Sequence, residues 1–328
     1  MSMRRVCRFR NSVALLLCLL GLPAGSAAAE LKRETTAAFD RYVAATEVRF
    51  GNELLPGGTF LYVDGLQPDA RESSYQQLKR GEILVEQLET KAPGVSADIP
   101  DGIVHHWVGL VFIPGVTLTN ALPVLQDYDH RAELYKPDVI ASRLLGRQGS
   151  DFKIFLRLYQ KKFTTVVFNS EYDIHWGQVD AGKMYSNSIS TRIAEVKDAN
   201  LPEGEEDPVG TGHGYLWRLN TYWRFEEKDG GVYVQCEAVS LTRNIPFGLG
   251  WLLRPLVTAI PRQSLNRALG RTREVVLQQA PHVITTRSGG SALMNRGDKE
   301  KAIAYYEKSL ALNPKNQNAV AMLARLRQ

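Results

Sequence analysis

A predicted β-hairpin followed at once by a long amphipathic helix, both within residues 213–279, limits the possible folds of this chain most strongly. Residues 215–225 alternate between two kinds of side chain, which is the pattern of a strand with one buried face. The predicted buried face carries Tyr215, Trp217, Leu219, Trp223 and Phe225, and the other face carries Arg218, Asn220 and Arg224. Residues 229–231 (Asp-Gly-Gly) supply the turn, because glycine tolerates the positive φ of a tight hairpin, and the return strand covers 232–242.

The segment after Gly248 is predicted to be a helix whose apolar face carries Leu249, Leu252, Leu256 and Ile260. Such a helix after a hairpin indicates a helix laid across a curved sheet, and this packing favours a ligand cavity between the two layers. Pro261 lacks a backbone N–H, so we expect a kink or break near the middle of the helix, which would serve as a gate to the cavity.

Five further strands are predicted before the hairpin, over residues 103–113, 139–147, 152–159, 163–176 and 184–197. Short turns join most of them, so successive strands are expected to be antiparallel. The predicted fold class is α+β: a helix-grip domain with a roughly seven-stranded, curved antiparallel sheet wrapped on the long C-terminal helix, plus a small α-helical tail. Because only this helix is long enough to cover a sheet face, Arg218 and Arg224 are expected in ion pairs on a solvent-facing side.

Residues 124–130 (Val-Leu-Gln-Asp-Tyr-Asp-His) and 135–145 (Tyr-Lys-Pro-Asp-Val-Ile-Ala-Ser-Arg-Leu-Leu) form a short-helix segment that leads into a strand. Together with the order of the elements around them, they resemble the START-like superfamily, also called SRPBCC, which includes polyketide cyclases and lipid-transfer proteins. The resemblance covers roughly residues 100 to 282. It implies an internal apolar cavity beneath the long helix, but it does not imply one particular activity.

The chain divides into four predicted parts. Residues 1–29 resemble a cleaved signal peptide, because four arginines precede an apolar run and three alanines, 27–29, supply the small residues of a cleavage site. Residues 30–98 are expected to form an N-terminal helical extension, with an edge-like strand over 82–88 and a linker containing proline and glycine at its end. Residues 99–283 are expected to form the helix-grip domain, and residues 284–328 a tetratricopeptide-like helical hairpin.

Export to the periplasm or the extracellular space is the expected consequence of the signal peptide. No integral membrane span is expected after cleavage, because Pro23 and Gly25 interrupt the apolar run too early for one. Cleavage removes four of the 40 basic residues, so 36 remain against 35 acidic residues and the net charge falls near +1. A charge this close to zero argues against nucleic acid as a partner.

The C-terminal tail shows the spacing of a tetratricopeptide repeat. Gly297, Ala302, Tyr306 and Pro314 lie at the offsets where such a repeat needs residues that let two helices pack closely. The tail holds one repeat and the start of another, whereas about three repeats are needed to stand alone. It is therefore expected to dock, and the main domain is preferred as its partner over a separate protein, since one repeat offers little groove.

The sequence carries no strong catalytic or metal-binding motif, so no catalytic residue, metal or cofactor is predicted. His105 and His106 are neighbours on a predicted strand and must point to opposite faces, so they cannot both bind one metal ion. Asp129 and His130 lie in a segment that is expected to be a solvated loop. Cys236 remains alone after cleavage and is expected to be a small buried residue.

The aromatic face is the best candidate for a binding site. Its predicted lining consists of Phe168, Trp176, Trp217, Leu219, Trp223, Phe225, Trp251, Leu256 and Ile260. These residues indicate a binding protein that holds a hydrophobic or amphipathic, lipid-like small molecule under the long helix. In a less favoured variant, one or two of the strand arginines point inward and hold an anionic head group; the candidates are Arg157, Arg192, Arg218, Arg224 and Arg243, of which Arg218 and Arg224 lie opposite the aromatic face. The alternatives are a cyclase or dehydratase that uses the same cavity, and an envelope module that recruits a protein partner through the tail.

Overall fold

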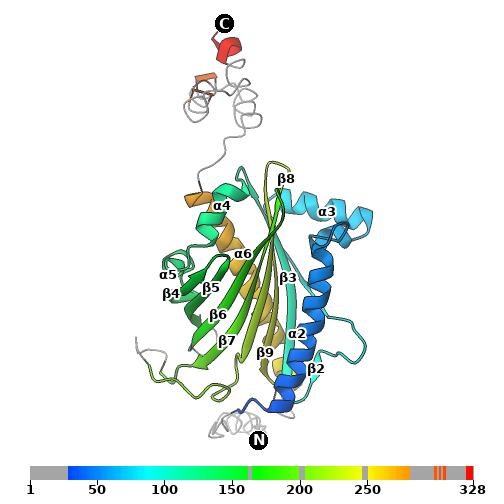
Figure 1. The fold of residues 1–328 in the computed structure, drawn as a ribbon, viewed down its shortest axis with the longest axis vertical. Helices are drawn as coiled ribbons and strands as arrows, with labels where there is room; N and C mark the ends of the chain where they lie inside the picture. The colour runs from blue at the N-terminus through cyan, green and yellow to red at the C-terminus, as the bar shows by residue number, and fades with distance from the viewer. Residues whose placement is uncertain are drawn as a thin grey trace, which may run out of the picture.

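The computed structural model describes residues 29–161, 165–198, 204–245 and 250–280, together with short stretches between 299 and 327. One large twisted sheet dominates this part of the chain, and helices lie on both of its faces (Figure 1). We call the face toward the last long helix the inner face of the sheet, and the opposite face its outer face.

Within the described residues, nine strands form a single antiparallel sheet in the order β1-β3-β9-β8-β7-β6-β5-β4, and the short β2 also pairs with β3. The strands are β1 (Leu84–Gln87), β2 (Asp98–Ile99), β3 (Gly102–Pro114), β4 (Val139–Gln148), β5 (Asp151–Lys161), β6 (Thr165–Asp180), β7 (Lys183–Glu195), β8 (Arg218–Lys228) and β9 (Gly231–Arg243). Strands β3 to β9 match the seven predicted strands, and β1 matches the predicted edge-like strand. The helix-grip α+β prediction is confirmed, with β2 as an addition.

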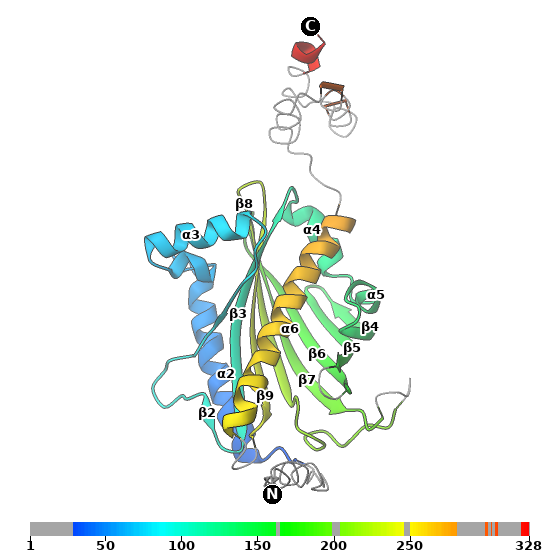
Figure 2. The same cartoon turned by 180° about the vertical axis from the view of Figure 1, so that it is seen from behind.

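The inner face is covered by α6 (Gly250–Gln279), which crosses the sheet diagonally (Figure 2). Its side chains Leu265 and Leu269 join a core cluster with Val111 of β3 and Val234 of β9. Gly109 of β3 makes this close approach possible, because a Cβ atom there would lie 2.5 Å from a methyl carbon of Leu269. On the inner face, α6 therefore packs mainly on the part of the sheet formed by β3.

The outer face is covered by the N-terminal segment, which contributes α2 (Arg33–Leu54), the 3-10 helix η1 (Tyr62–Gly65) and α3 (Pro68–Lys79). Phe39, Tyr42 and Phe50 of α2 pack with Tyr222 of β8 and Val239 of β9 in a second core cluster. The expectation that only the last helix covers the sheet is therefore wrong. The segment 30–98 also supplies β1, which pairs with β3 at one edge.

Two short helices, α4 (Leu118–Leu125) and α5 (Arg131–Leu134), lie between β3 and β4 in the chain. The side chain of Thr117 accepts a hydrogen bond from the backbone N–H of Asn120 and caps α4. The predicted break at Pro261 is absent, because α6 continues through this position as one helix. Within the described part of the chain, no helix is both long and apolar enough to cross a membrane.

Candidate functional site

A stack of three aromatic side chains lies on the inner face. The rings of Trp176 and Phe225 are 5.3 Å apart and nearly parallel, and those of Phe225 and Trp223 are 6.3 Å apart with an interplanar angle of 6°. Their stacking follows from strand register, because Phe225 lies opposite Met184 while Trp176 and Trp223 both lie opposite Ser186 of β7. The sheet thus presents a broad aromatic surface toward α6.

One end of this surface is closed by α4 and the loop after it. The indole N–H of Trp176 donates a hydrogen bond of 2.8 Å to the hydroxyl of Tyr128, which follows α4. Tyr128 also packs edge-on against Phe152 of β5. Burial raises the pKa of Tyr128 above its usual value. Because Tyr128, Phe152 and Trp176 are all buried, this end of the inner face is a packed core.

Serine hydroxyls lie among these apolar side chains. Ser186 lies between Trp176 and Trp223 across the strands, and Ser188 lies opposite Thr221. Ser240 lies opposite Leu219 on one side and His105 on the other. Among the described residues, the hydroxyls of Ser186, Ser188 and Ser240 have no hydrogen-bond partner, so they are available to polar atoms of a ligand.

His105 adds a neutral imidazole to the inner face. It is 3% exposed, and its Nε2 lies 3.0 Å from the hydroxyl oxygen of Thr242. Burial lowers its pKa from the usual 6.5 to about 4, so the ring is uncharged at neutral pH. His106 lies on the outer face, as the prediction of opposite faces requires. His105 was not among the predicted site residues, and its adjacency to Ser240 follows only from strand register.

Five of the predicted cavity residues lie on or beside the inner face. Trp176 and Phe225 belong to the inner core cluster, Leu219 and Trp223 pack against it half-buried, and Ile260 is a half-buried residue of α6. Phe168 is buried near the start of β6, at the position paired with Leu158 and Glu195. The side chains of Trp251 and Leu256 lie outside the described residues.

Trp217 was placed on the wrong face by the sequence analysis. It packs with α2 in the outer core cluster, on the side opposite to Leu219 and Trp223. The alternation fails because β8 begins only at Arg218, so Trp217 lies in a bend where side chains need not alternate. Its backbone N–H still donates to the carbonyl of Leu241.

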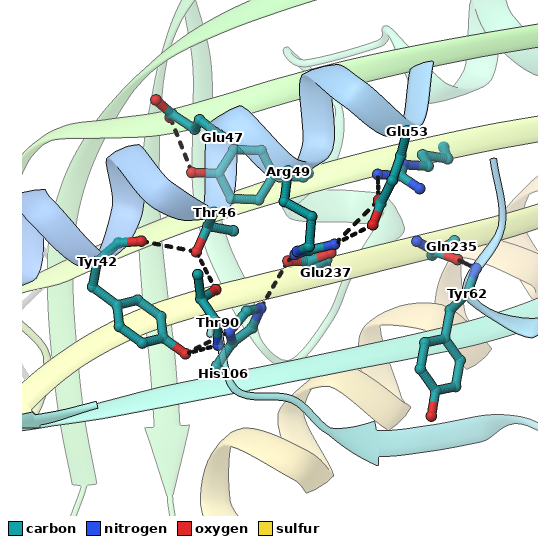
Figure 3. Close-up of polar contacts among 12 residues, drawn as sticks. Tyr42, Thr46, Glu47, Arg49, Glu53, Tyr62, Thr90, His106, Gln235 and Glu237 are labelled. Atoms are coloured by element: carbon teal, nitrogen blue, oxygen red, sulfur yellow. Dashed lines mark hydrogen bonds and ion pairs between the residues drawn. The ribbon is translucent and has the colours of Figure 1, made fainter. Parts of the chain in front are cut away.

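A buried network of charged and polar side chains holds α2 on the outer face (Figure 3). Tyr42 of α2 bonds through its hydroxyl to Nδ1 of His106 at 2.8 Å, and Nε2 of His106 lies 2.7 Å from the carboxylate of Glu237. Arg49 of α2 pairs with both Glu237 and Glu53. Burial raises the pKa of Glu237, but the hydrogen bond from His106 and the charge of Arg49 outweigh it and hold the pKa below its usual value.

Arg224 contradicts the prediction of a solvent-facing strand arginine, because it is only 1% exposed. Its guanidinium donates to the carboxylate of Glu53 and to the carbonyls of Thr59 and Phe60, and it lies 4.3 Å from the ring centre of Phe50. Burial lowers the pKa of this guanidinium, although Glu53 opposes the shift. Apart from Nε of Arg224, which is buried without a partner, these charged groups bond to one another and to the backbone, so the network anchors the outer layer and offers little to a ligand.

The remaining strand arginines differ from one another. Arg192 pairs with Glu206, which lies on the loop after β7 and not on a neighbouring strand. Arg157 is 8% exposed, and Arg218 and Arg243 are half-buried. Register places Arg157 beside Phe155 and Tyr159 on the outer face of β5, away from the aromatic stack, so the variant with an inward head-group arginine gains no support there.

An open groove of about 350 Å³ lies beside the network, along α2. Its walls are Ala45, Val48, Arg49, Asn52, Glu53, Gly58, Thr59, Lys91 and Ala92. Arg49 and Glu53 are already paired with each other, so much of the charge in this groove is committed to holding α2. The inner face is the better candidate for a ligand site.

In the tail, the family model described as Tetratricopeptide repeat matches residues 290–316, which confirms the predicted repeat. This range contains all four predicted repeat residues. Tyr306 is buried, whereas Gly297, Ala302 and Pro314 lie outside the described residues. Leu323 and Leu326 are also buried. Arg327 forms an ion pair with Glu307, so the two described stretches of the tail are in contact.

No curated protein matches this chain. Among solved structures, human STARD10 is 12% identical with a TM-score of 0.39, over 65% of this chain and 81% of its own. A STAR-related lipid transfer protein from Xanthomonas axonopodis is 18% identical with a TM-score of 0.35, over 53% of this chain and 95% of its own. The Zhui aromatase/cyclase from Streptomyces sp. R1128 is 10% identical with a TM-score of 0.33, over 53% and 94%. Sequence identities and TM-scores as low as these support no conclusion about function.

Proposed function

We propose that this chain binds an amphipathic small molecule, lipid-like in having a large apolar part, on the inner face of the sheet beneath α6. One observation carries the proposal: three serine hydroxyls without a described partner lie on the same face of the sheet as the aromatic stack, and a helix covers this face. Ser186 and Ser240 are buried residues among apolar side chains, where a hydrogen bond from a ligand to their hydroxyls would be made in an apolar setting. A ligand with polar groups along one side would satisfy these hydroxyls.

The apolar part of the ligand would contact apolar side chains of the same face. Trp107, Trp223 and Leu219 line the interior but remain half-buried, so their apolar surface is incompletely covered by the protein itself. Covering such surface with ligand is favourable, and aromatic rings suit flat or extended apolar groups. The combination favours an amphipathic ligand over a purely hydrocarbon one.

Native mass spectrometry of the purified protein tests the proposal. We expect a bound mass that is lost on denaturation, and we expect the double variant Ser186→Ala/Ser188→Ala to lower its affinity roughly 5- to 30-fold, because each lost hydrogen bond weakens binding by about 1 kcal/mol. The matched control is Ser73→Ala/Ser74→Ala on α3, on the other side of the sheet. A bare protein mass, with no binding of fluorescent lipid analogues, would contradict the proposal.

We also propose export, on the strength of the signal-like residues 1–29. The same mass spectrum reports on it, because a cleaved chain is expected to begin at Glu30. A mass that includes residues 1–29 in protein isolated from its own cell envelope would contradict export by cleavage.

One observation favours the enzymatic alternative, a cyclase or dehydratase. His105 is a neutral imidazole on the inner face, and a neutral imidazole can accept a proton from a bound substrate. An enzyme would change the mass or absorption of the bound molecule on incubation. His105→Asn would then retain binding and lose the change, whereas a binding protein would return the ligand unaltered.

The tail is proposed to bind a protein partner, in place of the preferred docking on the main domain. The three described core clusters draw their residues from positions 29–280, so deletion of 291–328 is expected to shift the free energy of unfolding by less than about 0.5 kcal/mol. Chemical unfolding of the full and truncated chains measures this, and pull-down with both forms shows whether a partner is lost. A large loss of stability would show that the tail is structural.

A further inference from the structure

The edge strand β4 exposes three aliphatic side chains. It is the last strand of the sheet, beside α5 (Figure 1). Its pairing with β5 skips Ile140 and Leu145, which are therefore extruded at two β-bulges. Ile140 is 45% exposed, Leu145 is 50% exposed and Leu144 is 36% exposed. Exposed apolar side chains on one edge strand mark a surface that another apolar phase can cover.

This edge is not open to another strand. The backbone N–H of Leu144 donates to the carboxylate of Asp129 at 2.8 Å. The hydroxyl of Ser142 donates to the carbonyl of Asp129 and accepts the N–H of Ala132. The segment around α5 thus occupies the hydrogen-bonding groups that a second strand would need, and the bulges break the register further. Pairing with a second copy of this chain is therefore disfavoured.

The same hairpin is strongly basic. Residues 139–162 contain six lysines and arginines and one acidic residue, whereas residues 30–328 as a whole contain 36 basic and 35 acidic residues. Arg143 and Arg147 of β4 are exposed, and neither forms an ion pair with any residue that the structure describes. Their guanidinium groups lie 4.8 Å and 4.7 Å from the ring centres of Phe155 and Phe152.

The acidic side chains beside this surface are engaged by other groups. Asp127 pairs with His130, Asp151 pairs with His175 and Asp138 pairs with Arg267. Arg267 offsets the charge of Asp138, whereas the charges of Arg143 and Arg147 are available to an anionic partner. Exposed aliphatic side chains between unpaired arginines match the boundary of a membrane, where acyl chains lie under anionic head groups.

We propose that the β4 edge, defined by Ile140, Arg143, Leu144, Leu145 and Arg147, is a docking surface for an anionic lipid bilayer. The aliphatic side chains enter the interface and the arginines contact the head groups. Leu144 lies opposite Ile154, an inner-face residue, so the bilayer would meet the sheet at the border of the proposed ligand site. The proposal does not depend on a ligand being bound there.

Co-sedimentation of the full mature chain with vesicles tests the proposal. We expect binding to phosphatidylcholine vesicles that contain phosphatidylglycerol, weaker binding at high salt, and little binding to phosphatidylcholine alone. Arg143→Gln/Arg147→Gln is expected to weaken binding roughly 30-fold, since each cation near an anionic surface contributes a factor of roughly five. Ile140→Ser/Leu145→Ser is expected to weaken it about tenfold or more.

Matched controls distinguish binding through this surface from nonspecific binding to vesicles. Leu55→Ser/Val209→Ser changes two aliphatic residues that are 60% and 48% exposed elsewhere, and Arg33→Gln/Arg41→Gln removes two exposed charges from α2. Both controls are expected to bind vesicles like the wild type, with thermal unfolding of all variants checked in parallel. Equal binding to neutral and anionic vesicles, or unchanged binding by both β4 variants, would overturn the proposal. A dimer that becomes a monomer in the Ile140→Ser/Leu145→Ser variant would overturn it in favour of a contact between copies.

Discussion

Replacing Arg224 with alanine is expected to lower the free energy of unfolding by about 3–5 kcal/mol, because it removes one partner from a buried charge network. The substitution leaves the carbonyls of Thr59 and Phe60 without this donor and leaves Glu53 with Arg49 as its remaining partner. It also empties the space over Phe50. The change is measured as a shift in the urea unfolding midpoint, with the slope of the transition unchanged. Limited proteolysis should also cut within α2 sooner than in the wild type, because the outer layer loses its anchor.

The matched control for Arg224 is Arg192→Ala. Arg192 also pairs with a glutamate, Glu206, but both side chains are partly exposed, at 33% and 28%. A pair of this kind contributes about 0–1 kcal/mol, so the control should change stability little. If both substitutions had the same small effect, the buried network would not be what holds α2 on the sheet.

Stability is expected to fall by about 3 kcal/mol between pH 6.5 and pH 4 because of His105 alone. Its pKa in the folded protein is lowered to about 4 from the usual 6.5, so in this interval the unfolded chain binds a proton that the folded chain does not. The contribution is therefore complete above pH 6.5, declines as the pH falls toward 4, and declines no further below that. Burial alone causes the shift.

Urea unfolding at a series of pH values checks the role of His105. The variant His105→Asn should show a shallower decline over this interval than the wild type, and the difference between the two curves isolates the histidine from carboxylates that titrate nearby. His175→Asn is the control, because His175 is 51% exposed in its pair with Asp151. Parallel curves for the wild type and His105→Asn would show that His105 is not held neutral by burial.

The succession of strands along the chain was predictable, because each strand is marked by local alternation of side chains and most are bounded by short turns. In residues 215–225 the alternation itself identified the faces correctly within the strand, and Arg224, Trp223 and Phe225 lie on the faces that it implies. What alternation cannot tell is whether a polar face meets water or another layer. The apolar spacing of Phe39, Tyr42 and Phe50 on α2 was the available signal that a second layer existed.

The candidate site was predictable in its aromatic part and not in its polar part. Trp176, Trp223 and Phe225 are large apolar residues at alternating positions, which indicate an inner face by themselves. Ser186, Ser188 and Ser240 are unremarkable in sequence, because single serines are common in strands. Only the register of β6, β7, β8 and β9 brings them beside the aromatic stack and His105.

The sequence by itself determined the antiparallel hairpin, the long helix after it and the repeat in the tail, because these rest on periods of a few residues. The tertiary structure decided that the sheet has two covered faces and that its charged side is a core. His106 and Glu237 are 131 positions apart, and Arg224 and Glu53 are 171 positions apart. Contacts at such separations depend on register and layer packing, which no local pattern encodes. The hairpin at Arg218–Arg243 is therefore a shared wall, with the proposed ligand site on one side and the buried charge network on the other.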